Sequence, residues 1–480
     1  MTTKTPSIDN PVTPSWLKLN GRRLDGRPYV SGDIEAKVLL EKLRAEKVPL
    51  QELTQGGING LINAGRIARM WVTDPAYGLP FLSSTDILQA DLNNLSLIAK
   101  KAARLNPLLI IHEGWTLITR SGTIGRIAYC RPDMSGMACT EDVLRVVPDS
   151  DKILPGYLYA YLNSKFGVPQ VIGGTYGTII QHIEPHHLAD LPVPRLGKDL
   201  EEATHQRVDR AARLRSEYQA QIKEATDLLF RSVGLHDITA SEWHAMGRDL
   251  GFSRVSTSHT SLRSLNFNPR LEACLTKVAG TTHMTLGEIC RGGKLQRSTR
   301  FTRVECEEVY GVKLVGQREL FWLEPEGRWI SPRHAPSDIF VQDETIVVAA
   351  QGTLGENEVF CRAEFITGPW LNYAYTEHLL RVQSGNPAIS GAFLFAFMRS
   401  EMVFRCLRSM SVGSKQQDLH RELLAQLPVP LPSENVRSDI EKLIRDAFAK
   451  RPEASKLEKE AIAMVEEVIQ EGTRWQPLSQ

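Results

Sequence analysis

The 480-residue chain contains an internal duplication, and this duplication limits the possible folds more than any other feature. Residues 173–194 align with residues 409–430, so that Gly177 matches Gly413 and a Leu-Pro-Val-Pro tetrapeptide ends both stretches. The same shift of 236 positions aligns residues 140–146 with 376–382, and residues 157–161 with 393–397. Residues 121–125 match residues 351–355 at a shift of 230, which implies six extra residues in the second copy between these blocks. A sequence repeated in this way predicts two similar units in tandem.

Three histidines of the first copy, His182, His186 and His187, stand close together with Glu184 among them, as the ligands of a metal ion would. The duplication argues against a metal site because the matching positions of the second copy carry Asp, Glu and Leu. The glycine, the leucines and the two prolines are kept in both copies. We therefore expect a turn, a short polar helix and an extended exit fixed by the prolines, with no metal.

The composition is that of a globular protein of several domains, with 42% hydrophobic and 24% charged residues. The formal net charge is +1, so any surface for a polyanion must be local. Seven scattered cysteines, none in a Cys-x-x-Cys pair, favour a reducing cytoplasm over a disulfide framework. No apolar run approaches ~18 residues and the first residues are polar, so we expect a cytoplasmic protein that does not enter a membrane.

Each copy is expected to fold as an α+β (mixed α/β) unit. Residues 116–119, 143–147 and 346–350 have the short apolar pattern of strands, and residues 155–165 and 388–410 that of buried helices. After each Pro-Val-Pro, apolar residues recur at three and four positions over about 33–35 residues, which predicts a helix ~50 Å long. The apolar stripe is narrow, as in helices that pair in a coiled coil. Two separate amphipathic helices, each lying on its own unit, are the alternative.

These patterns divide the chain into a first unit (1–196), a first long helix (197–235), a linker with a second unit (236–432), and a second long helix with a tail (433–480). Residues 236–264 are rich in Ser, Thr and His without a clear period, and we expect them to be irregular. Pro452 lies within the second long helix and is expected to break or kink it.

The chain has no recognisable catalytic signature. The phosphate-binding loop, the His-Glu-x-x-His zinc motif, the Gly-x-Ser-x-Gly elbow, the Gly-x-Gly-x-x-Gly fingerprint and the Asn-Pro-Pro-aromatic tetrapeptide of adenine methylation are all missing. Glu141 and Glu377 recur in both copies, but each stands without a second carboxylate. The sequence therefore predicts a protein that is not an enzyme and has no catalytic residue and no cofactor.

Positive charge gathers at one place in each copy. The second copy has five Arg or Lys residues between positions 291 and 303 and no acid between Glu288 and Glu305. The first copy has Arg66 and Arg69 and no acid between positions 52 and 74. A flexible, acid-free segment of this composition can follow a phosphate backbone and reach base edges. A solvated surface loop is the alternative, but the recurrence in both copies favours nucleic-acid binding.

The arrangement resembles the specificity (S) subunit of type I restriction–modification enzymes. The resemblance rests on residues 120–126 and 177–194, on their partners 351–355 and 413–430, and on the helical residues 208–217 and 444–453. It implies two target-recognition domains in tandem, each followed by a long helix, with the helices forming an antiparallel coiled coil. It further implies a non-catalytic reader of double-stranded DNA with a bipartite target. The helices would dock methyltransferase (M) subunits, and a restriction/translocase (R) subunit would join them.

The candidate DNA-contacting residues lie in the basic segments and in the turns that carry the resemblance: Arg66, Arg69, Arg120, Thr123, Arg126, Tyr176, Gln181, Lys294, Arg297, Arg300, Arg303, Thr353, Lys415, Gln416 and Gln417. Pro452 and the long segment before the second copy depart from the family pattern. A specificity subunit of a related type II system, an RNA-binding protein that uses its Gly-x-x-Gly turns, and an interaction scaffold are the alternatives.

Overall fold

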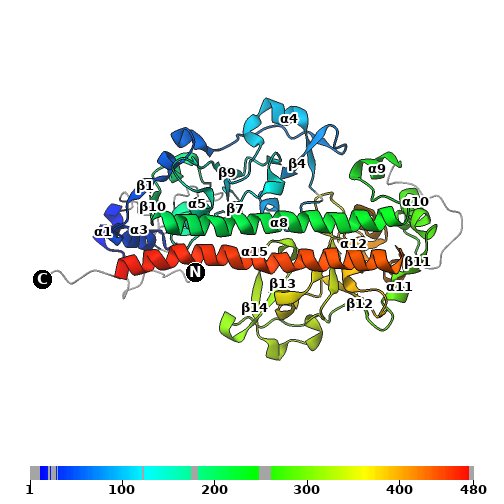
Figure 1. Cartoon of the computed structure of the whole chain (residues 1–480). Helices are drawn as coiled ribbons and strands as arrows, with labels where there is room; N and C mark the ends of the chain where they lie inside the picture. Colours follow the sequence, from blue (N-terminus) through cyan, green and yellow to red (C-terminus); the bar gives the residue numbers. More distant parts are fainter. Residues whose placement is uncertain are drawn as a thin grey trace.

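The structure is a computed structural model, and it describes residues 11–19, 22, 29, 31–93, 95–121, 124–173, 182–247 and 261–474. Two globular units flank a pair of long helices, α8 (Lys198–Ser232) and α15 (Glu434–Arg474). Figure 1 shows the first unit on one side of the helix pair and the second unit on the other, displaced toward opposite ends. The chain is thus α+β, as the sequence predicts.

In its described residues, the first unit has two four-stranded sheets and one two-stranded sheet. The first has the order β2-β9-β6-β7, with β2 (Leu61–Ile62), β6 (Thr116–Thr119), β7 (Ile127–Tyr129) and β9 (Val143–Val146). The second has the order β3-β5-β4-β8, with β3 (Trp71–Val72), β4 (Gly78–Leu82), β5 (Leu97–Ala99) and β8 (Ala138–Cys139). The third pairs β1 (Lys47–Pro49) with β10 (Pro192–Pro194).

The second unit repeats the main sheet and the two-stranded sheet, whereas its other sheets differ from those described in the first unit. Its main sheet has the order β12-β19-β15-β17, with β12 (Lys294–Arg297), β15 (Thr345–Ala349), β17 (Ala363–Ile366) and β19 (Leu379–Gln383). A second sheet joins β14 (Gly327–Ile330), β13 (Val312–Val315) and β18 (Ala374–Tyr375). β11 (His283–Thr285) pairs with β22 (Pro428–Pro430). β21 (Gln417–Leu419) lies between β16 (Gln351–Gly352) and β20 (Ser411–Gly413) and pairs with both. The register repeats as well, because Val48 lies opposite Val193 and Met284 lies opposite Val429.

The helices of the two units also correspond. They are α3 (Asp33–Lys42) and α10 (Pro269–Ala279), α5 (Pro155–Leu162) and α12 (Gly391–Met398), α6 (Gly167–Gly173) and α13 (Glu401–Ser409), and α7 (Pro185–Leu188) and α14 (Arg421–Ala425). All eight residues of α12 are buried because the helix is apolar on every side. The single buried helix expected over residues 388–410 is wrong. The structure has two helices there, because Ser400 ends the first and its hydroxyl accepts a hydrogen bond from the Val403 amide, 3.2 Å away, at the start of α13.

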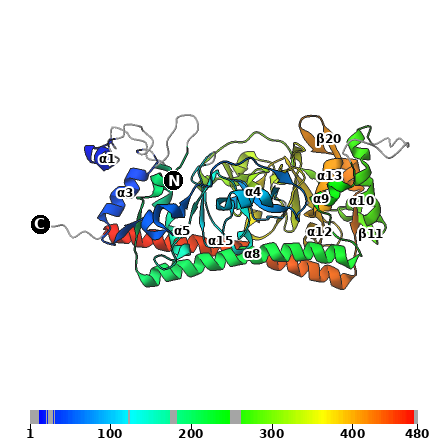
Figure 2. The same ribbon diagram turned by 90° about the horizontal axis from the view of Figure 1, so that it is seen from above.

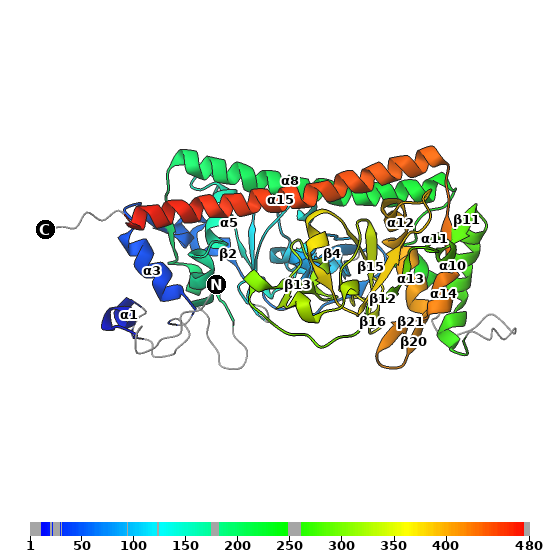
Figure 3. The ribbon, with the colours of Figure 1, turned by 90° about the horizontal axis from the view of Figure 1, so that it is seen from below.

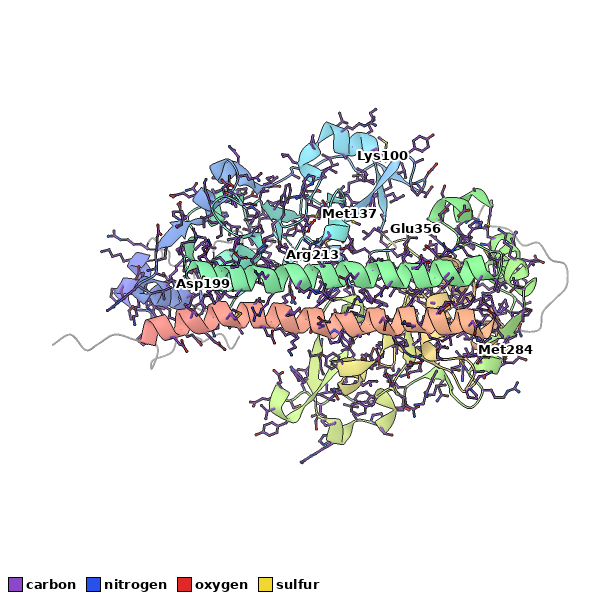
Figure 4. The ribbon with its side chains drawn as sticks, in the orientation of Figure 1. Lys100, Met137, Asp199, Arg213, Met284 and Glu356 are labelled. Carbon is purple, nitrogen blue, oxygen red and sulfur yellow. The ribbon has the colours of Figure 1, made fainter. Side chains whose placement is uncertain are left out.

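The two long helices lie antiparallel and in contact. Arg207 of α8 is 3.9 Å from Glu460 of α15, whereas Glu217, further along α8, is 3.6 Å from Lys450, further back along α15. Figure 4 shows the resulting arrangement, with Asp199 near one end of the helix pair and Met284 of the second unit near the other. The apolar stripe predicted for α8 is buried along its whole length, from Val208 to Leu229. The helices therefore pair, and the alternative of two separate surface helices is wrong.

Pro452 does not break α15. The helix runs without interruption from Glu434 to Arg474 with the proline inside it. A proline in a helix removes one amide donor, which costs stability but can be offset by packing. The neighbouring Arg451 supplies such packing, since its guanidinium is buried, lies 3.2 Å from the Glu364 carboxylate and donates to the Trp322 carbonyl at 3.2 Å.

The segment after α8 is more ordered than its composition indicates. Within residues 236–264, residues 248–260 lie outside the described part, but the rest includes helix α9 (Ala240–Ala245). Thr239 and Glu242 form a reciprocal capping box at its start, and Trp243 is buried in the core of the second unit. The expectation of an irregular segment is wrong for α9.

The two units meet at a contact that each makes in the same way. Gln89 and Trp322 form an antiparallel bridge, the Ala90 amide donates to the Phe321 carbonyl at 2.9 Å, and the Leu323 amide donates to the Leu88 carbonyl at 2.7 Å. At this point of the fold, equivalent residues of the two units are 233 positions apart, because Phe81 lies opposite Ala138 and Leu314 lies opposite Ala374. Leu88 therefore corresponds to Phe321 and Ala90 to Leu323, so the two bonds are one bond made twice. Such a self-complementary contact requires an approximate two-fold axis between the units.

The long helices obey the same axis. Their register places Arg215 beside Pro452 and Ser216 beside Arg451, and Arg215 and Arg451 are equivalent residues of the two copies. The axis thus passes through the middle of the helix pair and through the bridge of Gln89 and Trp322. In the orientation of Figure 1 it runs along the line of sight. We call it the pseudo-two-fold axis.

None of the helices in the described part of the chain is long and apolar enough to span a lipid bilayer.

Candidate nucleic-acid interface

One side of the molecule faces away from the long helices and carries β16, β20, β21 and β12; we call it the distal face. Figures 2 and 3 show the β20–β21 hairpin projecting there, opposite α8 and α15. Gly413 has φ 101°, a conformation that favours glycine, and it lets the chain turn tightly at the hairpin tip. The tip residues Ser414, Lys415 and Gln416 are exposed. Two of the predicted DNA contacts therefore stand at the tip of a fixed hairpin.

Gln417, the third prediction in this hairpin, is buried. Its amide group donates to the Ser414 carbonyl, and its amide oxygen accepts a hydrogen bond from the Ser411 hydroxyl at 3.2 Å. The side chain closes the hairpin from within, so we leave Gln417 out of the surface proposed to contact DNA.

The basic segment of the second copy is not the flexible loop expected from its composition. Its first residues form β12, an edge strand of the main sheet in which Arg297 lies opposite Leu380. The Arg297 guanidinium forms an ion pair with Asp418 of the hairpin. Lys294, at the start of β12, is half-buried. The sheet and the hairpin therefore fix this part of the segment.

The last arginine of each basic segment is paired with the acid that recurs in both copies. Arg69 Nη2 lies 3.1 Å from the Glu141 carboxylate, and Arg303 Nη2 lies 3.0 Å from the Glu377 carboxylate. The acids are 236 positions apart and the arginines 234. The shift of 234 also relates equivalent residues of β2 and β12, because Leu61 and Leu295 lie opposite equivalent valines. The two ion pairs are therefore equivalent, and the acids that seemed isolated in the sequence each hold an arginine.

A buried arginine fixes the turn that carries each of these acids. Arg145 donates to the carbonyl groups of Thr140 at 3.0 Å and of Cys139 at 2.5 Å. Arg381, its equivalent, donates to the carbonyl groups of Thr376 at 3.1 Å and of Tyr375 at 2.7 Å. Burial lowers the pKa of the Arg145 and Arg381 guanidinium groups from the usual value. These carbonyl oxygens provide the hydrogen bonds that a buried guanidinium needs.

At the same shift of 234, Arg66 is equivalent to Arg300. Each copy thus carries an exposed arginine three residues before the arginine that is ion-paired with a glutamate. Thr353 is exposed as well, directly after the end of β16. The backbone around it is fixed because Arg408 Nη2 donates to the carbonyl groups of Thr353 at 3.1 Å and of Gly355 at 2.7 Å.

The two arginines predicted around the first Gly-x-x-Gly turn both bind other residues of the chain. Arg120 forms an ion pair with Glu184 and donates from Nε to the Ile183 carbonyl at 3.1 Å. Arg126 forms an ion pair with Glu326 of the second unit, with 2.7 Å between Nη2 and Oε2, and its guanidinium lies over the Trp322 ring. Arg126 thus belongs to the contact between the units, and we leave it out of the proposed DNA surface.

Three predicted contacts, Thr123, Tyr176 and Gln181, lie outside the described residues. The His186 and His187 rings lie 4.0 Å apart between centroids with their planes tilted by 49°, and His187 Nδ1 accepts a hydrogen bond from the Glu184 amide at 3.0 Å. The described part of the chain contains no group of three or more His, Cys, Asp or Glu residues placed to hold a metal ion.

Comparisons with known proteins give structural matches only. No family model and no curated protein matches the chain. It is similar to the crystal structure of a type I restriction–modification system S subunit from M. genitalium, at 13% identity and a TM-score of 0.36, over 91% of this chain and 97% of that one. It is also similar to the HsdS subunit from Thermoanaerobacter tengcongensis, at 12% identity and a TM-score of 0.27, over 88% and 96% of the two chains. A structure concerning complex assembly and conformational transition of the type I R-M system matches at 13% identity and a TM-score of 0.27, over 88% and 97%.

Proposed function

We propose that the chain is the specificity subunit of a type I restriction–modification system and reads a double-stranded DNA target in two halves. The observation that carries this proposal is the pseudo-two-fold axis. Duplex DNA has two-fold axes perpendicular to its length, and proteins with two-fold symmetry place equivalent parts on two half-sites of it. The repeated units, their repeated register and their self-complementary contact give a single chain this symmetry.

Each unit supplies the same basic elements under this symmetry. The exposed Arg66 of the first unit corresponds to the exposed Arg300 of the second, and in each unit it lies three residues before an arginine held by a glutamate. Contacts that recur in both units suit the phosphate backbone, which is alike in every half-site. Residues that differ between the units suit the base edges, so the two half-sites should have unlike sequences separated by an unspecified gap.

The helix pair has the length that such a target needs. α8 has 35 residues and is therefore ~52 Å long at 1.5 Å per residue. Two readers on one side of DNA stand about one helical turn apart, roughly 34 Å. The helices can hold the units at this spacing, and their charged outer sides remain for methyltransferase subunits, with a restriction/translocase subunit completing the complex. The chain itself would neither methylate nor cut.

The exposed arginines supply a prediction about salt. Replacement of Arg66 or Arg300 by alanine should weaken DNA binding about equally for all sequences and reduce the slope of log K against log salt by about one. The reason is that each side chain is exposed and free to neutralise one phosphate. Titrations of labelled duplex at several salt concentrations measure this slope. Unchanged affinity and slope in the Arg66→Ala, Arg300→Ala double variant would return these residues to the class of solvated surface arginines.

The proposed function is tested by mapping methylated motifs in the DNA of cells with and without this chain. We expect one interrupted motif with two unlike halves to lose its methylation when the chain is removed. Identical methylation in both cells would refute the proposal. A motif that is read by a single combined methyltransferase and nuclease would indicate a related type II system instead.

A further inference from the structure

One place in the fold is equivalent in the two units but carries different chemistry, and this inference rests on the proposed function. Leu61 of β2 lies opposite Val146, and Leu295 of β12 lies opposite Val382, which is 236 positions after Val146. Two residues beyond these leucines stand Asn63 in the first unit and Arg297 in the second. Asn63 and Arg297 therefore occupy equivalent positions at the end of the edge strand of each main sheet.

In the second unit this point is a rigid polar cluster. Arg297 is ion-paired with Asp418, and Gln351 Nε2 lies 3.4 Å from the same carboxylate oxygen. The Gln317 side chain fixes the main chain of Gln351. It accepts a hydrogen bond from the main-chain amide at 3.0 Å and donates one to the main-chain carbonyl at 2.9 Å. The Arg297 and Asp418 side chains remain 29% and 31% exposed, so the cluster is both fixed and accessible to a ligand.

In the first unit the corresponding cluster has other members. Asn63 Nδ2 donates to the Glu184 carboxylate at 3.1 Å, and Arg120 binds the second oxygen of the same carboxylate. The acid again comes from the segment that precedes the short helix α7 or α14. Both units therefore have a polar side chain bound to a carboxylate at this position. In the first unit it is the amide of Asn63, and in the second it is the guanidinium of Arg297.

We propose that Arg297 reads a guanine in the half-site bound by the second unit and that Asp418 is its positioning residue. A guanidinium has five N–H donors, so the carboxylate can hold one edge while another reaches the O6 and N7 acceptors of guanine. The carboxylate also cancels the charge of Arg297 and would be repelled by a phosphate, which disfavours a backbone contact. Fixing the side chain before binding reduces the entropy lost on recognition. In the first unit, Asn63 at the same point should select a different base.

The test maps the methylated motif in cells that carry the full chain with Arg297→Ala, Asp418→Asn or Arg328→Ala. Arg328 is the matched control because it forms an exposed pair with Glu305 at 3.1 Å in the same unit. We expect Arg297→Ala to reduce the preference for guanine at one position of the second half-site by about 5- to 150-fold, and to leave the first half-site unchanged. Asp418→Asn should weaken the preference at that same position, and Arg328→Ala should leave the motif intact.

The outcomes separate this inference from the proposed function. A motif that stays identical in the Arg297→Ala and Asp418→Asn variants overturns the inference and leaves the proposed function standing. If the unaltered chain directs no methylation, the proposed function itself fails. If Arg297→Ala abolishes all methylation, Asp418→Asn decides, since it keeps the arginine and the size of its partner: relaxation at a single position supports the inference, and an unchanged motif overturns it.

Discussion

Replacement of Arg399 by methionine is expected to lower the free energy of unfolding by about 3–5 kcal/mol, because it leaves a carboxylate at the contact between the units without its partner. Arg399 is buried at the end of α12 and binds Asp91 of the first unit at 2.8 Å. Its Nη1 also donates to the Ile222 carbonyl at 3.1 Å and the Thr226 hydroxyl at 2.8 Å, both on α8. One side chain thus joins both units to the helix pair. Denaturant titration of the full chain measures the loss.

The Asp91→Asn, Arg399→Met double variant is the control. Removing both charges leaves no unpaired ion, so the double variant should lose less stability than the two single variants together. A double variant whose loss equals the sum of the two single losses would show that the pair is not coupled. Denaturant titration of the four proteins completes this cycle.

The same pair makes stability depend on acid. Burial raises the pKa of the Asp91 carboxyl, but the charge and hydrogen bonds of Arg399 outweigh this, so its pKa lies below the usual 3.8. A lowered folded-state pKa stabilises the protein above pH 3.8, and this contribution is lost as the pH falls through the lowered value. The Asp91→Asn variant should therefore lack this part of the acid dependence.

Matched insertion of seven residues after Ala220 and after Lys456 is expected to lengthen the unspecified gap of the target by about 3 base pairs. The two sites are equivalent and lie on opposite sides of the pseudo-two-fold axis, so both helices grow by the same ~10.5 Å and their pairing is kept. Both half-sites should remain as they were, because neither unit is altered. Motif mapping in cells reads out the gap and the half-sites together.

The structure adds a second expectation to this insertion. The units touch each other directly at Gln89 and Trp322, so moving them apart breaks the bridge and its two flanking hydrogen bonds. The lengthened protein should therefore be less stable than the original. Insertion in α8 alone is the control, since it shifts one helix against the other and should abolish recognition. A gap that does not respond to the matched insertion would show that the helices do not set the spacing.

The sequence predicts the large features of the fold because they depend on periodicity. The strand over residues 116–119 and the buried stripe of α8 follow from patterns of apolar residues that local chemistry imposes. The antiparallel pairing of the helices required the resemblance as well. The break at Ser400 and the helix α9 were missed, although the Thr239–Glu242 capping box was a visible signal.

The candidate site could be predicted only as a region. Arg66 and Arg300 were named, but their equivalence depends on a shift of 234 that only the paired strands reveal. The ion pairs of Arg297 with Asp418 and of Arg126 with Glu326 join residues more than 100 positions apart. Such contacts depend on tertiary packing, which a pattern in one segment does not encode. Asn63 is uncharged and lies outside the repeated motifs, so the sequence alone does not distinguish it from other polar residues.

The bridge of Gln89 and Trp322 between the units is made by main-chain atoms on both sides of the pseudo-two-fold axis. Amide and carbonyl groups are the same in every residue, so the bonds of Ala90 with Phe321 and of Leu323 with Leu88 do not depend on which side chains stand there. Substitutions at these positions therefore leave the bridge intact, whereas the ion pairs of Arg399 with Asp91 and of Arg126 with Glu326 depend on their side chains. A unit that keeps the bridge and these two ion pairs can otherwise diverge, so under the proposed function recombination can exchange one unit for a divergent version while the other keeps its place and its half-site.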